Sequence, residues 1–293
     1  MDQAANLRRL VVAKKDTIPS NTRSIAITSG KGGVGKTSLA VSLSIALAKG
    51  NASVTLLDAD LGLANINVIL GIIPKFNLYH VIKGKKKLKD IVIEVPEGIK
   101  IIAGAAGFHQ LANLNEKQRA DFISELSEIA NDDFLIVDTG AGVSQNVLSF
   151  LTSSDEIIVV TTPEPTAITD AYGIIKSIAS QSTDKTIKLI VNRCQSVSEG
   201  KRVAQRIINI AGQFLNIKVE NLGFVFDDIS VPKSVRSQKP FIVSYPKCKA
   251  SVCVNIIADK IANREPGNYQ NGGISGFVKK LFASRAENES DEE

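Results

Sequence analysis

The sequence predicts an α/β fold: one domain built on a doubly wound, mostly parallel sheet with helices on both faces, and flexible helices at its two ends. The main observation is an alternation of patterns. Short apolar runs of strand length alternate with longer segments in which apolar residues recur at helical spacing. This alternation is typical of β-α-β units, whose connecting helices cover both faces of parallel strands. In addition, 44% of the 293 residues are apolar, which is enough to bury a substantial core.

The expected elements fill residues 23–262, which we take as the domain. Strands are expected at residues 23–28, 53–57, 99–102, 134–137, 156–160, 186–191 and 221–225. Helices are expected at residues 37–49, 116–130, 166–180, 197–215 and 247–262. The first of these helices is rich in good helix formers, and Gly50 ends it.

A glycine-rich loop links the first strand to the first helix. Residues 30–37 read Gly-Lys-Gly-Gly-Val-Gly-Lys-Thr and meet the phosphate-binding pattern G-x-x-x-x-G-K-[ST]. Lys36 is expected to neutralise phosphate charge, and the Thr37 hydroxyl can ligate Mg²⁺. The other residues expected to line the nucleotide are Gly30, Lys31, Gly32, Gly33, Val34, Gly35 and Ser38. The strand-loop-helix context supports a P-loop, so ATP and Mg²⁺ are the predicted cofactors.

The loop carries one lysine more than the pattern requires. Lys31 stands at its second position, where a lysine points away from its own nucleotide and can reach a phosphate held by a second copy of the chain. The sequence therefore predicts a homodimer in the ATP-bound state.

Carboxylates follow two of the predicted strands. Asp58 and Asp60 follow the strand at 53–57, and Asp138 follows four apolar residues in a Walker B arrangement. Ligands of doubly wound sheets bind at the carboxyl ends of the strands, so all three are candidates for the phosphate crevice. Asp58 and Asp138 are candidate Mg²⁺ ligands, and a carboxylate here can also orient the attacking water. The alternative is that strand-end aspartates cap helices.

The segment after Asp138 continues Thr-Gly-Ala-Gly, and its two glycines suit a loop that moves when the γ-phosphate leaves. We include Gly142 among the expected nucleotide-binding residues for this reason.

These three motifs resemble those of the MinD/ParA group of deviant-Walker-A ATPases, over about residues 23–262. The resemblance implies that Lys31 acts across a sandwich dimer and that Lys36 binds phosphate in catalysis. It implies further that Asp60 positions the hydrolytic water and that Asp138 is the Walker B acid.

Asn192, at the end of the strand at 186–191, matches the position where this group contacts the base. An asparagine that simply closes a turn is the alternative.

Residues 1–22 precede the domain as a short helix and linker. Asp2, Gln3, Ala4, Leu7 and Arg8 resemble the N-terminal activator segment of the FlhG (YlxH/FleN-type) ATPases, which set flagellar number and position. The resemblance implies that the segment stimulates the FlhF GTPase, with Arg8 as the main group and Gln3 assisting. Flagellar basal-body (C-ring) components are further candidate partners. The alternative is a helix docked on its own domain.

A polar linker at 263–273 leads to a short amphipathic segment at 274–285. Its apolar stripe and flanking lysines comprise Ile274, Phe277, Val278, Lys279, Lys280, Leu281 and Phe282. Such a helix can lie in the interface of an anionic membrane, and it resembles the membrane-targeting helix of MinD-type proteins. The acidic tail at 286–293 should weaken that attraction. The competing interpretation is a helix packed on the domain surface.

Bulk properties narrow the remaining function classes. The three cysteines are too few for a disulfide framework and offer no convincing set for an iron–sulfur carrier. The sequence shows no signal segment and no apolar run of membrane-spanning length, so we expect a cytoplasmic protein reversibly attached to the inner face of the membrane.

The lysine run at 83–89 permits contact with nucleic acid or an anionic membrane, and a solvated loop is its default interpretation. A DNA-partition ATPase and a cell-division site regulator are the alternative functions. We do not expect nucleic acid to be the main partner.

Overall fold

The structure is a computed structural model that describes residues 22–60, 65–104, 125, 132–181, 185–263, 277, 280 and 281. Eight strands form one sheet: β1 (Arg23–Ser29), β2 (Val54–Ala59), β3 (Val92–Glu94), β4 (Lys100–Ala103), β5 (Phe134–Ala141), β6 (Glu156–Thr161), β7 (Thr186–Cys194) and β8 (Val219–Phe226). Their order in the sheet is β3-β4-β2-β5-β1-β6-β7-β8. All neighbours are parallel except β3 and β4. The predicted doubly wound, mostly parallel fold is confirmed.

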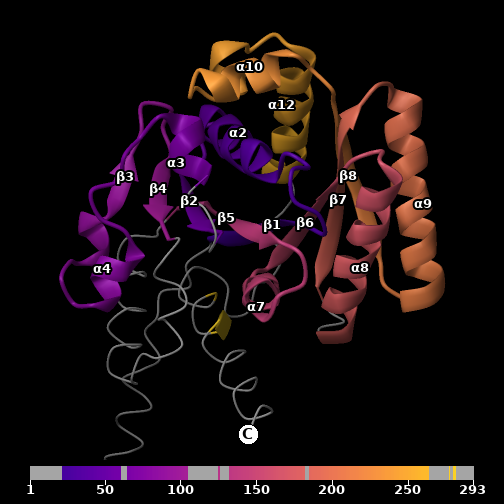
Figure 1. Ribbon diagram of the computed structural model, residues 1–293, viewed down its shortest axis with the longest axis horizontal. Helices are drawn as coiled ribbons and strands as arrows, with labels where there is room; N and C mark the ends of the chain where they lie inside the picture. The colour runs from indigo at the N-terminus through magenta and orange to yellow at the C-terminus, as the bar shows by residue number, and fades with distance from the viewer. Residues whose placement is uncertain are drawn as a thin grey trace, which may run out of the picture.

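Helices cover both faces of this sheet (Figure 1). They are α2 (Lys36–Lys49), α3 (Asn65–Leu70), α4 (Leu78–Ile82), α7 (Gln145–Ser153), α8 (Pro165–Gln181), α9 (Val197–Leu215), α10 (Ser230–Arg236), α11 (Phe241–Ser244) and α12 (Lys249–Ala262), with a 3₁₀ turn η1 (Leu88–Asp90). In Figure 1, α2, α10 and α12 lie above the sheet, and α7, α8 and α9 lie on the opposite side.

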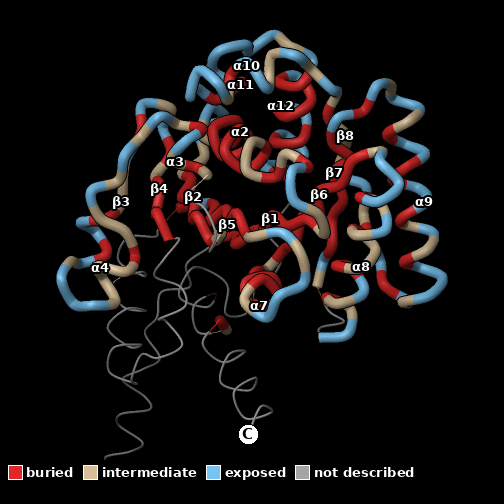
Figure 2. The backbone as a smooth tube through the Cα atoms, in the orientation of Figure 1, coloured by how far each residue is buried: buried red, intermediate tan, exposed pale blue. Residues whose placement is uncertain are grey.

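Side-chain alternation in the strands divides the core into two layers. In β1, Ile25 and Ile27 pack with the α2 and α12 side, whereas Ala26 packs with the α7 and α8 side. In β6, Ile158 and Ile157 divide between the two layers in the same way. Figure 2 shows the result, with the central strands buried and the outer helices exposed on one side. Strands buried on both faces explain why the sequence shows continuous apolar runs.

The connections place the crevice at the centre of the sheet. The chain leaves β1 through α2 to reach β2 on one side, and α7 later joins β5 to β6 on the two flanks of β1. The strand order therefore reverses around β1, and ligands of such sheets bind at the carboxyl ends of the strands at that point. None of the helices within the described ranges combines the length and the apolar character of a membrane span.

Several boundaries differ from the predictions. The strand predicted at 134–137 is too short, because β5 continues to Ala141 and pairs with β1 and β2, so only Gly142 of the two loop glycines lies beyond the strand. The antiparallel edge strand β3 was not predicted, since three residues carry too little pattern. Of the predicted helix at 116–130 only Glu125 is described, and it is helical.

Candidate functional site

The glycine-rich loop joins β1 to α2 at the centre of the carboxyl edge. Gly33 and Gly35 have φ angles of 79° and 89°, a left-handed conformation that favours glycine. Gly30 is required for a different reason, because a Cβ there would lie 2.0 Å from the carbonyl oxygen of Asp170 on α8. The loop is thus shaped by its glycines, and it delivers the first turn of α2, with the half-buried Thr37 and Ser38, to the crevice. Free N–H groups at such a helix start suit a phosphate.

Lys36 lies buried at the base of the loop. Its ammonium group is 3.1 Å from Asp138 Oδ1 on β5 and also donates to the carbonyl oxygen of Thr139. Thr139 is itself fixed, because its hydroxyl donates to the carbonyl oxygen of Ile27 on β1 at 3.1 Å. A buried charge pair of this kind holds the lysine in place at the base of the loop, where the sequence predicts the phosphate.

Two predicted metal ligands face each other across adjacent strands. Asp58 on β2 and Asp138 on β5 are register partners, and both side chains are fully buried. One carboxylate oxygen of each, Oδ2, has no hydrogen-bond partner among the described residues. Thr37, at the start of α2, is close enough to Asp138 to lower the pKa of that carboxyl. Mg²⁺ is usually held by one or two carboxylates together with phosphates and water, so this donor set fits the ion.

The same burial changes the acidity of both aspartates. Burial, together with the neighbouring charge of Asp138, raises the pKa of Asp58 to about 7. Burial also raises the pKa of Asp138, although Lys36 and Thr37 oppose the shift. Each aspartate therefore resists ionisation on its own, and a bound cation would favour its ionised form.

Asp60 lies just outside this pair. Its backbone N–H donates to Asp58 Oδ1 at 3.2 Å, and its carboxylate accepts from Asn65 Nδ2 on α3 at 3.4 Å. Asp60 Oδ1 also lies 3.6 Å from where a Cβ of Gly140 would be, at the end of β5. The structure thus brings the three predicted aspartates together.

Lys31 projects from the opposite side of the loop. Its ammonium group lies 3.0 Å from the hydroxyl oxygen of Thr166 and 3.3 Å from Glu164 Oε2, and its side chain is 42% exposed. Both partners stand at the start of α8, whereas the partners of Lys36 stand on β5. The two loop lysines therefore point to different places, as the prediction of an intermolecular role for Lys31 requires.

The remaining predicted nucleotide residues also reach this edge. Gly142 adopts a left-handed φ of 88° and its N–H donates to the carbonyl oxygen of Ser29 at 2.9 Å. Asn192, at the end of β7, donates through Nδ2 to the carbonyl oxygen of Val34 at 2.8 Å, and its Oδ1 accepts the N–H of Arg193 at 2.9 Å. Asn192 thus braces the P-loop, and its contact with a base stays a prediction.

Sequence reasoning missed four residues of the site: Asn65, Thr139, Glu164 and Thr166. Thr139 was findable, because it follows the Walker B aspartate directly. Glu164 and Thr166 lie just beyond the end of β6, the position where α/β sheets place ligand-side residues. Their contact with Lys31 spans more than 130 residues of sequence, which no local pattern reports.

The predicted terminal segments are described only in part. The activator residues Asp2, Gln3, Ala4, Leu7 and Arg8 lie outside the described residues, as do Ile274, Val278, Lys279 and Phe282. Phe277 and Leu281 are buried in the core layer of α7 and α8, and the Phe277 ring stacks on that of Phe150 with centroids 6.3 Å apart. Lys280 Nζ lies 3.7 Å from Asp155 Oδ1. This is the packing of a helix docked on its own domain, the competing interpretation of the segment.

Comparisons with known proteins agree with the site. A family model described as an AAA domain matches residues 22–191. The chain is similar to the antiactivator FleN of Pseudomonas aeruginosa, with 36% identity over 88% of this chain and 92% of that protein. It is similar to the flagellum site-determining protein YlxH of Helicobacter pylori, with 35% identity over 89% of this chain and 90% of that protein. A solved structure of the septum site-determining protein MinD from Pyrococcus horikoshii, complexed with Mg-ADP, superposes with a TM-score of 0.67 at 26% identity, covering 83% of this chain and 96% of that one.

Proposed function

The chain belongs to the FlhG (YlxH/FleN-type) branch of the MinD/ParA family of P-loop ATPases, and from that premise we propose that it is a dimerising Mg-ATP switch that controls flagellar placement and number. In the proposed cycle, ATP joins two copies of the chain, the dimer attaches to the membrane and its partners, and hydrolysis releases it. The observation that carries this proposal is the position of Lys31, which faces α8 rather than the crevice that holds Lys36.

Nucleotide binding is the first step. Lys36 exchanges an acceptor on β5 for phosphate oxygens, and the first turn of α2 supplies N–H donors to the same phosphates. Thr37, Asp58 and Asp138 would hold Mg²⁺, which would offset the charge of the phosphates when bound. Asp60, beside Asp58 and Gly140, would orient the attacking water. The N–H of Gly142, just after β5, donates to the carbonyl oxygen of Ser29 on β1. A structural change at the γ-phosphate would therefore be transmitted to the segment that follows β5.

Dimerisation is the second step. Lys31 contacts Glu164 and Thr166 at the surface, where its side chain is partly exposed to solvent. Surface pairs of this kind hold a lysine only weakly. A phosphate presented by a second copy carries more charge than one carboxylate, so it would outcompete Glu164 for the ammonium group. ATP would thereby join two chains.

Membrane attachment is the third step. Phe277 and Leu281 are buried against the domain in the structure, so their apolar surface is not available to lipid in this arrangement. We infer that the ATP-bound dimer releases the helix. One short helix binds lipid weakly, whereas two helices held in one dimer gain effective concentration at the membrane.

The GTPase step rests on the resemblance of residues 2–8 to the FlhG activator segment. Arg8 would offset charge on the phosphate transferred in the FlhF site, as arginines supplied in trans do in other GTPases. A measurement of FlhF GTPase turnover with a peptide of residues 1–22 tests this step. We expect stimulation that is lost in Arg8→Ala peptide, and no stimulation by the parent peptide would remove this part of the proposal.

Sedimentation equilibrium with Mg-ATP tests the dimer. The parent chain should double its mass with ATP and not with ADP, and Asp60→Ala should retain the dimer by blocking hydrolysis. Lys31→Ala should stay monomeric and lose most ATPase activity, whereas Lys201→Ala, an exposed lysine on α9, should behave as the parent. A Lys31→Ala chain that dimerises and hydrolyses ATP normally would contradict the mechanism.

Deletion of residues 274–285 should in turn abolish ATP-dependent sedimentation with liposomes.

A further inference from the structure

Six lysines, five exposed and one half-buried, lie within residues 75–90 around α4 and the turn that leads to β3, and we call this group the lysine edge. Its members are Lys75, Lys83, Lys85, Lys86, Lys87 and Lys89. Asp90 is the one acidic residue within 75–90, so this segment carries a net charge of +5. The whole chain also carries +5, so the other residues balance one another. The net positive charge of the protein is thus equal to that of these 16 residues.

The lysine edge is a built turn. The N–H groups of Lys85 and Lys86 donate to the carbonyl oxygen of His80 at 2.9 and 3.2 Å, and Gly84 takes a left-handed φ of 66°. Asp90 Oδ2 accepts the N–H of Lys87 at 3.0 Å. Leu88 is fully buried and anchors the turn, and Lys85, Lys87 and Lys89 around it are exposed. An ordered turn therefore holds these lysines.

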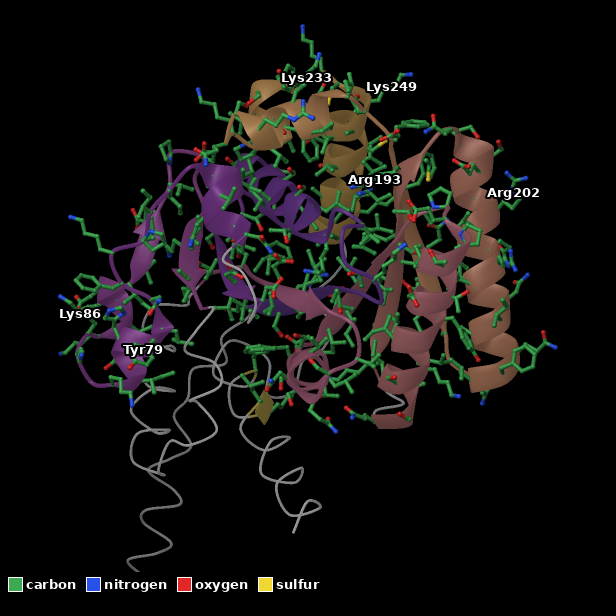
Figure 3. The ribbon with its side chains drawn as sticks, in the orientation of Figure 1. Tyr79, Lys86, Arg193, Arg202, Lys233 and Lys249 are labelled. Atoms are coloured by element: carbon green, nitrogen blue, oxygen red, sulfur yellow. The ribbon has the colours of Figure 1, made fainter. Side chains whose placement is uncertain are left out.

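Within the part of the chain that the structure describes, these lysines make no ion pair. Lys86 Nζ lies 4.1 Å from the ring centre of Phe76, and Lys83 Nζ lies 5.8 Å from that of Tyr79. The neighbouring carboxylate of Glu125 accepts the N–H of Leu88 at 2.6 Å and so bonds to the backbone. Figure 3 shows Lys86 and Tyr79 at the outer margin of the molecule. Charge of this density attracts a polyanionic surface.

The lysine edge lies on the same side of the sheet as the C-terminal helix. Leu78 and Leu88, which lie beneath the edge, share one buried cluster with Phe277 and Leu281. In Figure 1, α4 and the yellow segment at Phe277 both lie below the sheet, opposite α10 and α12. A surface that receives the released helix would therefore meet the lysines too.

We propose that the lysine edge is a second membrane contact, which binds the headgroups of anionic phospholipids beside the C-terminal helix. The inference rests on the membrane attachment proposed above. Single weak membrane signals need a partner signal for stable attachment, and a polybasic patch is an effective one. The acidic tail at 286–293 repels anionic lipid next to the helix. The lysine edge offsets that repulsion from a separate position.

The observations favour lipid over nucleic acid as the occupant. Single-stranded nucleic acids stack on free aromatic faces, whereas Lys86 covers Phe76 and the edge of His80 meets the same ring at 5.3 Å between centroids. The lysine edge also has no arginine, the residue that reads base edges and phosphates with two parallel hydrogen bonds. Lysine point charges suit a diffuse anionic layer.

Co-sedimentation of the full chain with vesicles tests the inference. The vesicles are phosphatidylcholine alone or with 30% phosphatidylglycerol, with Mg-ATP, in the Asp60→Ala background that slows hydrolysis. The variant replaces Lys85, Lys87 and Lys89 with glutamine. Its matched control replaces Lys233, Lys239 and Lys249, three exposed lysines in the segment from α10 to α12, with glutamine. Figure 3 shows Lys233 and Lys249 on the opposite side of the sheet from Lys86.

We expect the lysine-edge variant to lose about 100-fold in binding to phosphatidylglycerol vesicles, since each lysine near an anionic leaflet contributes about fivefold. The control should keep the parent's affinity, and raising salt should erase the difference. Equal binding by parent and variant would overturn the inference while leaving membrane attachment intact. No ATP-dependent binding by the parent would overturn both. A variant that keeps vesicle binding but loses retention on duplex DNA would assign the lysine edge to nucleic acid instead.

Discussion

Asp58 and Asp138 are direct register partners on neighbouring parallel strands, and each keeps one buried carboxylate oxygen without a partner among the described residues. Lys36 neutralises Asp138 at 3.1 Å, so Asp58 carries the electrostatic cost of the pair. Burial and Asp138 together raise the pKa of Asp58 to about 7 from an ordinary value of 3.8. The site is thus arranged to bind a cation. Without a cation, ionisation of the buried Asp58 at alkaline pH destabilises the fold.

Asp58→Asn should therefore stabilise the nucleotide-free chain, and the gain should grow with pH. The folded protein binds the Asp58 proton more tightly than the unfolded chain does, because its pKa is higher in the folded state. The stability that this gives is fully present when the pH is below the unfolded-state pKa, and it is lost as pH rises through about 7. The neutral amide avoids that loss. We expect the gain to be about 2–3 kcal/mol larger at pH 8 than at pH 5, at 1.36 kcal/mol for each pKa unit. Urea unfolding at both pH values measures it, and a pH-independent gain would contradict the shifted pKa.

Gly30→Ala should damage both the fold and nucleotide binding. A Cβ at Gly30 would lie 2.0 Å from the backbone oxygen of Asp170, so α8 must move away from the loop. We expect a loss of about 3 kcal/mol in unfolding free energy, at the upper end for overpacking. Gly32→Ala is the matched control, because its Cβ would have no neighbour within 4 Å. Equal stability of the two variants would show that α8 yields easily.

The sequence predicted the parts of this site that depend on residue type at fixed spacing. Gly30, Lys36 and Asp138 belong to short motifs whose chemistry allows few substitutions, and the strands that carry them are buried on both faces and therefore read as apolar runs. The central sheet was predictable for the same reason. The contact of Asn192 with Val34 was not, since it is set by how β7 and the loop pack together.

Short and edge elements escaped prediction for a physical reason. The edge strand β3 has three residues and pairs on one side with β4, so its period is too brief to recognise. The turn at Leu88 is held by a hydrogen bond from the Leu88 N–H to the side-chain carboxylate of Glu125, 37 residues away. The position of Phe277 against Phe150 likewise depends on tertiary packing, because the same apolar stripe suits a lipid surface and a protein core equally.

Glu164→Gln should make dimerisation easier without changing stability. The pair with Lys31 is exposed, so its loss should alter the unfolding free energy by less than about 1 kcal/mol. Removing the competing carboxylate frees Lys31 for a phosphate on the second chain, and we expect half-maximal dimerisation at about two- to fivefold lower ATP concentration. Light scattering during ATP titration measures this, with Glu94→Gln on the exposed edge strand as control. A higher ATP requirement would mean that Glu164 supports the dimer.

Phe277→Trp should report the docking of the C-terminal helix. The chain has no tryptophan, so the new indole is a unique fluorophore. Phe277 is 2% exposed and stacks on Phe150, so emission should be blue-shifted and weakly quenched by acrylamide without nucleotide. In the Asp60→Ala background, Mg-ATP should raise the quenching severalfold, and added phosphatidylglycerol vesicles should lower it again as the indole enters lipid. Phe214→Trp, at a position 67% exposed on α9, is the control and should stay quenchable throughout. If neither Mg-ATP nor vesicles changed the acrylamide quenching of the Phe277→Trp chain, the helix would stay docked. Membrane attachment would then need another surface.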